Sequence, residues 1–357
     1  MSPPLFLPLA LALALAPRPP VDGAGKLADA YVGAVREVNE KHARKPGATT
    51  EDELAEELPR KAQRALEELL ESRADAAPEA LARCAEAALE LARVEDFERA
   101  RARLEELAPE RAAELGTALV RPRFLLRGLN GLDEAYLEHF AAILEPVLAG
   151  YDEVFGFREW SKVPGKKLRV RVHLEEQITR PPHFAPQFDH HSEIDFPVVD
   201  KERLRSPTAD GKFLFYGLCH ELGHVIAMWG RPGHEEDHHA WAHYTGLALM
   251  DHLAAAKDPA LAELRDVRWR SLAKEQAELA AVEPSLETRE GTLVTLFRLH
   301  EALGSKAIGD AIDLLDEKDA RLRVHRVRYY TFRELGQGLR EVVEDRNQRK
   351  LVDELLP

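Results

Sequence analysis

Residues 212–229 read KFLFYGLCHELGHVIAMW, and His220, Glu221 and His224 stand near the middle of this run. Apolar side chains surround these three on every side of a helix built on the segment, which is typical of a buried helix. Positions i and i+4 of a helix lie on one face, about 6 Å apart along the axis. His220 and His224 are therefore spaced to bind one metal ion, with Glu221 at its open side. Such binding would satisfy polar groups that are otherwise costly to bury.

This spacing of two histidines and a glutamate predicts hydrolytic chemistry at a zinc ion. Zinc held by His220 and His224 lowers the pKa of a bound water to about 7. Glu221 would take the proton of that water as it attacks a carbonyl carbon, and would pass it to the leaving amine. We therefore expect Glu221 to be the catalytic residue of a zinc metallopeptidase, with a peptide or protein as the substrate.

A catalytic zinc site needs a third protein ligand and leaves the fourth position open. The metzincin spacing places that ligand six residues after His224, but Gly230 occupies this position. The remaining candidates stand at the start of the next predicted helix, over 235–255, and are His234, Glu235, Glu236, Asp237, His238, His239 and His243. We expect His239 to be the third ligand because it lies about one turn into that helix, and Glu236 is the next candidate.

Other polar residues are candidates for supporting roles. His243 and Asp237 could orient the ligating imidazoles. Side chains that could stabilise the oxyanion are Tyr244, His325, Tyr329 and Tyr330. A loop predicted over 179–191 holds three further histidines, His183, His190 and His191. Loop histidines are usually solvated side chains, and the sequence does not rank these groups.

The two histidine-bearing helices together resemble the gluzincin clan of zinc metallopeptidases. In that clan the second helix usually carries the ligand as a glutamate in a stretch like Glu-Gly-Trp-Ala-x-Tyr. Here the stretch reads His239-Ala240-Trp241-Ala242-His243-Tyr244, so a histidine replaces the glutamate. Three histidines also form a competent zinc set. The resemblance covers roughly residues 124–251, and it implies a zincin-like fold with Zn²⁺ as the cofactor.

The periodicity of the chain predicts an α+β fold that is predominantly helical. Residues 24–119 are expected to form an all-α accessory domain, and residues 120–357 a zincin-like peptidase domain with a small mixed sheet and helices at its end. In the first of these, Thr50 opens a helix with a capping box. Residues 78–94 and 95–107 are expected to form a helical hairpin that is faintly similar to a tetratricopeptide unit.

Two strands and a glycine are expected to surround the helix that carries His220 and His224, which we call the metal helix. Residues 168–174 alternate apolar and polar side chains, as a half-buried strand does. A second strand covers 194–198 and contains Pro197, which predicts an edge position where a peptide substrate could add as a further strand. Gly223 is expected to allow a strand backbone to pass close to the metal helix. Beyond Asp258 we expect the chain to be helical again, with the clearest helices over 293–303, 307–315 and 330–343.

Composition and the amino terminus limit partners and location. The 357 residues carry a formal net charge of −14, which argues against a nucleic-acid partner. Residues 1–23 begin with an uncharged apolar run that is too short to span a membrane and is typical of a signal peptide. We expect export, to the periplasm or medium, and no transmembrane span in the mature chain. Cys84 and Cys219 alone make no disulfide framework.

Two alternatives remain open on the sequence. The first is an exported helical protein that binds a partner, with a zincin fold that is not catalytic. Glu221 argues against it, because a structural metal needs ligands but no general base. The second is a zinc amidase or esterase, since the pattern does not distinguish between amide and ester substrates.

Overall fold

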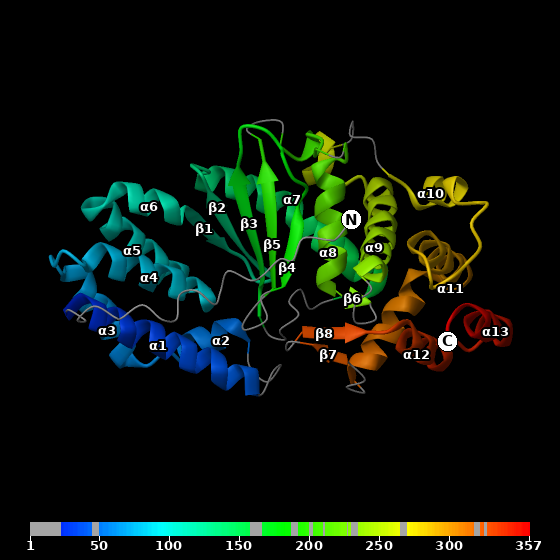
Figure 1. Cartoon of the computed structure of the whole chain (residues 1–357), viewed down its shortest axis with the longest axis horizontal. Coiled ribbons are helices and arrows are strands. Elements are labelled where there is room, and N and C mark those ends of the chain that lie inside the picture. Colours follow the sequence, from blue (N-terminus) through cyan, green and yellow to red (C-terminus); the bar gives the residue numbers. More distant parts are fainter. Residues whose placement is uncertain are drawn as a thin grey trace, which may run out of the picture.

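The computed structural model describes residues 23–44, 50–157, 166–186, 192–199, 203–209, 211–226, 228–229, 235–264, 270–317, 322–324 and 327–357. Within these ranges the fold is α+β and predominantly helical, as the sequence predicts (Figure 1). None of the helices in these ranges combines the length and the apolar character that a membrane span requires. Residues 1–22 of the predicted signal peptide lie outside the described residues.

The amino-terminal part consists of helices that share a core of their own. They are α1 (Gly23–Arg44), α2 (Glu51–Glu56), α3 (Arg60–Glu71), α4 (Ala77–Glu90), α5 (Val94–Leu107) and α6 (Pro109–Leu115). Thr50 begins α2 with the predicted capping box, in which its hydroxyl and the carboxylate of Glu53 each accept a backbone N–H. Helices α4 and α5 form the predicted hairpin, and Phe97 on α5 is fully buried between them and their neighbours.

A five-stranded mixed sheet follows these helices. Its strands are β1 (Thr117–Val120), β2 (Phe124–Leu129), β3 (Leu168–Leu174), β4 (His183–Pro186) and β5 (Ser192–Val198), in the order β1-β2-β3-β5-β4. The three central strands are parallel, and β1 and β4 run antiparallel to them at the two edges. Helix α7 (Glu134–Phe155), capped by the side chain of Asp133, connects β2 to β3 and covers one face. On that face the Phe140 and Phe196 rings lie 5.3 Å apart.

The expected edge position of the second strand is wrong. β5 is an interior strand, and the edge is β4, in a segment that the sequence predicts to be a loop. Pro197 is accommodated because the β4–β5 ladder ends at Asp195, so β5 has a partner strand on only one side at the proline. The edge strand next to the metal helix is therefore β4, and Figure 1 shows it between β5 and that helix.

The carboxyl-terminal part contains the metal helix, a small second sheet and further helices. The elements are α8 (Leu214–Ile226), β6 (Met228–Trp229), α9 (Glu235–Ala256), α10 (Leu272–Glu278), α11 (Arg289–Glu317), β7 (Leu322–Val324), β8 (Val327–Tyr330), α12 (Phe332–Val342) and α13 (Arg346–Leu355). The expectation that the chain is helical beyond Asp258 is wrong over β7 and β8, which form a hairpin that pairs with β6. Gly304, at φ 79°, breaks α11 between the two predicted helices.

Buried charges join the amino-terminal helices to the sheet. The Glu51 carboxylate on α2 accepts hydrogen bonds from both terminal nitrogens of Arg169 on β3, at 2.5 and 2.9 Å. Lys166 Nζ lies 3.5 Å from the same carboxylate, and the backbone N–H of Lys167 donates to it at 3.0 Å. The Glu51 side chain is fully buried. Two cations and one anion therefore face each other where water is excluded.

Candidate metal centre

The metal helix α8 lies close against α9 because each presents a glycine to the other. A Cβ on Gly223 would lie 2.4 Å from Thr245 Oγ1 and 2.8 Å from Ala242 Cα. Across the same contact, a Cβ on Gly246 would lie 3.3 Å from the backbone nitrogen of His220. Gly223 thus gives room to a helix and not to the expected strand. The close approach lets a side chain of moderate length on α9 reach the histidines of α8.

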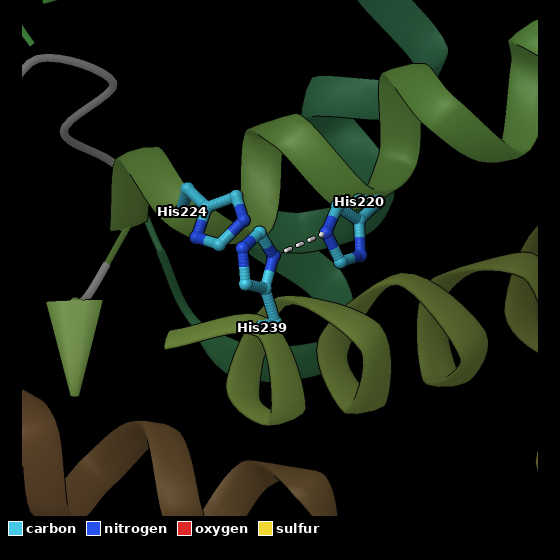
Figure 2. Close-up of side chains that lie close together, drawn as sticks. All are labelled: His220, His224 and His239. Atoms are coloured by element: carbon cyan, nitrogen blue, oxygen red, sulfur yellow. Dashed lines mark hydrogen bonds between the residues drawn. The ribbon is translucent and has the colours of Figure 1, made fainter. Parts of the chain in front are cut away.

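His239 is the side chain on α9 that extends to His220 and His224. One ring nitrogen from each of His220, His224 and His239 lies within 4.8 Å of the other two. His239 Nδ1 and His220 Nε2 are 3.4 Å apart. Two nitrogens bound to one tetrahedral zinc at about 2.05 Å would be about 3.3 Å apart. Figure 2 shows the His239 ring rising from α9 toward the two rings on α8.

The surroundings of the three rings favour metal binding on one open side. His224 is buried, His220 is half-buried and His239 is exposed, so the group lies at the rim of the core. Burial, and next the neighbouring imidazoles of His239 and His243, lower the pKa of His220 well below its ordinary value. A neutral imidazole is the form that binds a metal. Among the described residues these three form a group of histidine side chains that could hold a metal ion.

Of the other ligand candidates, only His238 and His243 have described side chains, and neither belongs to this group. His234 lies outside the described residues, as do the side chains of Glu235, Glu236 and Asp237, although their backbone begins α9. His238 is described and lies outside the group. His243, one turn beyond His239, has its ring centre 6.5 Å from that of His220, and its ring nitrogens contact Tyr216 and Glu275. The structure thus joins His239 to the two predicted ligands and leaves Glu236 untested.

His243 belongs to a buried hydrogen-bonded chain beside the metal group. Its Nε2 lies 3.6 Å from the carboxylate of Glu275 on α10, and its Nδ1 contacts the hydroxyl of Tyr216 on α8. Because a carboxylate only accepts, we assign the ring proton to Nε2, which faces Glu275, and the Tyr216 hydroxyl then donates to Nδ1. Arg270 completes the chain, 2.6 Å from Glu275 and with its guanidinium over the Tyr216 ring.

The sequence spacing indicates two members of this hydrogen-bonded group, Tyr216 and His243. Tyr216 precedes His220 by four residues and His243 follows His239 by four, so both pairs share a helix face. That spacing could have singled out Tyr216, which the sequence analysis missed. Glu275 and Arg270 carry no such signal, since only tertiary packing brings them to His243. Burial lowers the pKa of His243, and the hydrogen bond to Glu275 opposes this.

The four side chains predicted as candidates for stabilising the oxyanion lie in different places. Tyr244 is fully buried, and its hydroxyl bonds to His300 Nδ1 at 3.0 Å, so it serves as a core residue. Tyr330 is also buried in the core. The backbone of Tyr329 pairs with Met228 directly after α8, but its side chain lies outside the described part. His325 lies wholly outside the described residues.

Of the predicted loop histidines, His183 is on the edge strand β4, while His190 and His191 lie outside the described residues. His183 Nε2 is 3.5 Å from the buried carboxylate of Asp195 on β5. Asp195 also contacts His173 Nε2 and lies 2.8 Å from a terminal nitrogen of Arg180. His183 thus belongs to a group that ties the segment before β4 to the sheet.

A turn precedes α8, and in it the Thr208 hydroxyl donates to the Lys212 carbonyl at 3.1 Å. Cys219 on α8 and Cys84 on α4 are free and buried in two different cores.

No protein-family model matches this chain, and no curated protein matches its sequence.

Proposed function

We propose that this protein is a zinc-dependent peptidase, in which His220, His224 and His239 hold the metal and Glu221 is the general base. One observation carries the proposal: α9 brings a third imidazole to the two that the sequence pattern places on one face of α8. The ring nitrogens at 3.4 Å match the separation that tetrahedral zinc requires, about 3.3 Å. The exposure of His239 supports an open site, which catalysis needs and a closed structural site does not.

When bound, zinc lowers the pKa of water towards about 7 and polarises the substrate carbonyl. The Glu221 carboxylate takes the proton from the attacking water as the new C–O bond forms. It then delivers this proton to the amine nitrogen as the C–N bond breaks. Glu221 is buried, with 8% of its surface exposed, so its carboxylate works where few waters compete for the proton.

The edge strand β4 supports an extended peptide as the substrate. β4 is antiparallel to β5 and forms one end of the sheet. The segment before it packs on α8, where the Pro182 ring lies 3.0 Å from a Cβ built on Gly217. A peptide that adds to the outer edge of β4 would form main-chain hydrogen bonds while its scissile bond lies near the metal helix. The same edge gives an ester with no peptide backbone little to bind.

The test is hydrolysis by wild type and Glu221→Gln, measured with a mixed peptide library and mass spectrometry. We expect the variant to lose about 10²- to 10⁴-fold in rate, the usual contribution of a general base. Its zinc content should equal that of wild type, because Glu221 is not a ligand. Full hydrolysis by the zinc-loaded variant would overturn the mechanism. Cleavage of p-nitrophenyl esters alone, with no peptide cleaved, would replace the peptidase by an esterase.

A further inference from the structure

A cavity of about 600 Å³ lies among the amino-terminal helices, between α1, α4 and α6. Its volume is in the range of small-molecule sites. The aliphatic part of its wall comes from Val32, Val35, Ala82, Ala87 and Leu115. None of its lining residues belongs to α8 or α9, so the cavity is separate from the metal centre.

Asn39 on α1 lines this cavity and carries an unused hydrogen-bond donor. The residue is only 2% exposed, and its Oδ1 accepts a hydrogen bond from the buried ammonium of Lys166. Because an ammonium group only donates, this contact fixes which way the amide is turned. The Nδ2 group is then directed away from Lys166, and it is buried with no hydrogen-bond partner. A buried donor of this kind calls for an acceptor.

Among the described residues, one arginine of the cavity wall, Arg36, has no ion-pair partner. Its acidic residues each have a cation nearby: Glu79 and Glu114 share Arg111, Glu86 pairs with Arg127, and Glu90 lies in the field of Lys166. Arg83 pairs with Asp29. Arg36 lines the cavity three residues before Asn39, and within the described residues no acidic side chain pairs with it. Residues three apart are neighbours on one helix face, so the free guanidinium and the free amide N–H share a wall.

We propose that this cavity binds an aliphatic carboxylate, such as the carboxyl-terminal residue of a peptide or a short fatty acid. The carboxylate accepts a hydrogen bond from Asn39 Nδ2 and pairs with Arg36. The aliphatic body packs against the walls around Val35 and Leu115. This site does not depend on the proposed hydrolysis.

Calorimetric titration of the full chain tests the site with two acids, octanoate and acetyl-Ala-Val-Leu. Octanamide and the carboxyl-terminal amide of the same peptide are the controls. We expect saturable binding of at least one acid. Its amide should bind about 10- to 100-fold more weakly, because losing a hydrogen bond to a charged group lowers the affinity by about this factor. Preference for the peptide acid identifies a peptide end as the ligand, and preference for octanoate identifies a fatty acid. Binding of neither acid, or equal binding of acids and amides, would overturn the proposal.

Substitutions locate the binding in this cavity. Asn39→Asp keeps an oxygen toward Lys166 but replaces the N–H donor by an acceptor, so it should weaken acid binding about 10-fold or more. Arg36→Gln, on the exposed face of α1, keeps the fold and should weaken binding in the same direction. Arg64→Gln is the matched control, because Arg64 is an exposed arginine on α3 that does not line the cavity. Unchanged acid binding in Arg36→Gln would place the ligand elsewhere.

Discussion

Replacing Gly223 by alanine tests the glycine contact on which the metal centre depends. The added methyl carbon would lie 2.8 Å from Ala242 Cα, and 2.4 Å from the hydroxyl oxygen of Thr245. The first of these is backbone and cannot rotate away. Carbon atoms pack at about 3.5–4.0 Å, so α9 must move back by about 1 Å. Because His239 is carried by α9, it would withdraw from His220 by a similar amount.

The expected cost has two opposing parts. Overpacking of this kind destabilises by about 1–3 kcal/mol. Alanine in place of glycine within a helix recovers about 1 kcal/mol. The net loss in the free energy of unfolding should therefore be about 0–2 kcal/mol, which leaves the protein folded. Zinc–ligand distances normally lie within about 0.2 Å of their usual values, so a withdrawal of about 1 Å takes His239 out of bonding range. Zinc affinity should fall on the order of 10- to 100-fold, the range seen when the support of a ligand is lost.

The assay pairs chemical denaturation with zinc titration against a competing chelator. Gly33→Ala is the matched control, because Gly33 lies within α1 and a Cβ there meets nothing within 4 Å. That variant should gain about 1 kcal/mol and keep its zinc affinity. If Gly223→Ala also gained stability and kept full zinc affinity, the inference that these glycines set the distance between α8 and α9 would be refuted.

Three further predictions concern the buried polar groups. Glu51→Gln leaves the cations of Arg169 and Lys166 buried without their anion, and denaturation at pH 7 should show a loss of about 3–5 kcal/mol; a loss below about 1 kcal/mol would contradict this. Burial by itself raises the pKa of Glu51, but Arg169 and Lys166 outweigh it and hold the pKa below its usual range. The stabilisation by the ionised Glu51 carboxylate is therefore present above about pH 4.3 and fades as the pH falls below this value. The difference in free energy of unfolding between wild type and Glu51→Gln should shrink from pH 7 to pH 3. A difference that stays constant would refute the ion pairing of Glu51. Tyr216→Phe removes the donor to His243 Nδ1 and should cost about 1–3 kcal/mol in denaturation with zinc content unchanged, whereas loss of zinc would make Tyr216 a support of the ligands.

The sequence was most informative where spacing along one element carries the information. Helix periodicity put His220 and His224 on one face, and placed His239 a turn into the next helix, where the structure brings it to the other two. Local chemistry also predicted the Thr50 capping box. Each of these depends on contacts within about four residues.

The failures lie where distant segments meet. β4 is short and sits in a proline-containing segment, so its only signal is its pairing with β5. β7 and β8 are equally short, and they are strands because they pair with each other and with β6. Gly223 indicated a close approach, but a glycine does not specify whether a strand or a helix comes near. In the same way, Glu275 reaches His243 only through the packing of α10.

The most direct measurement of the central claim is the zinc content of purified wild type, His239→Ala and His252→Ala, by elemental analysis after removal of loose metal. His252 is on the same helix and bonds to Glu153 at 2.9 Å, away from the metal group. We expect about one zinc per chain in wild type and in His252→Ala, and a large loss in His239→Ala, because a catalytic zinc needs all three protein ligands. Unchanged zinc in His239→Ala would contradict the assignment of His239 as the third ligand.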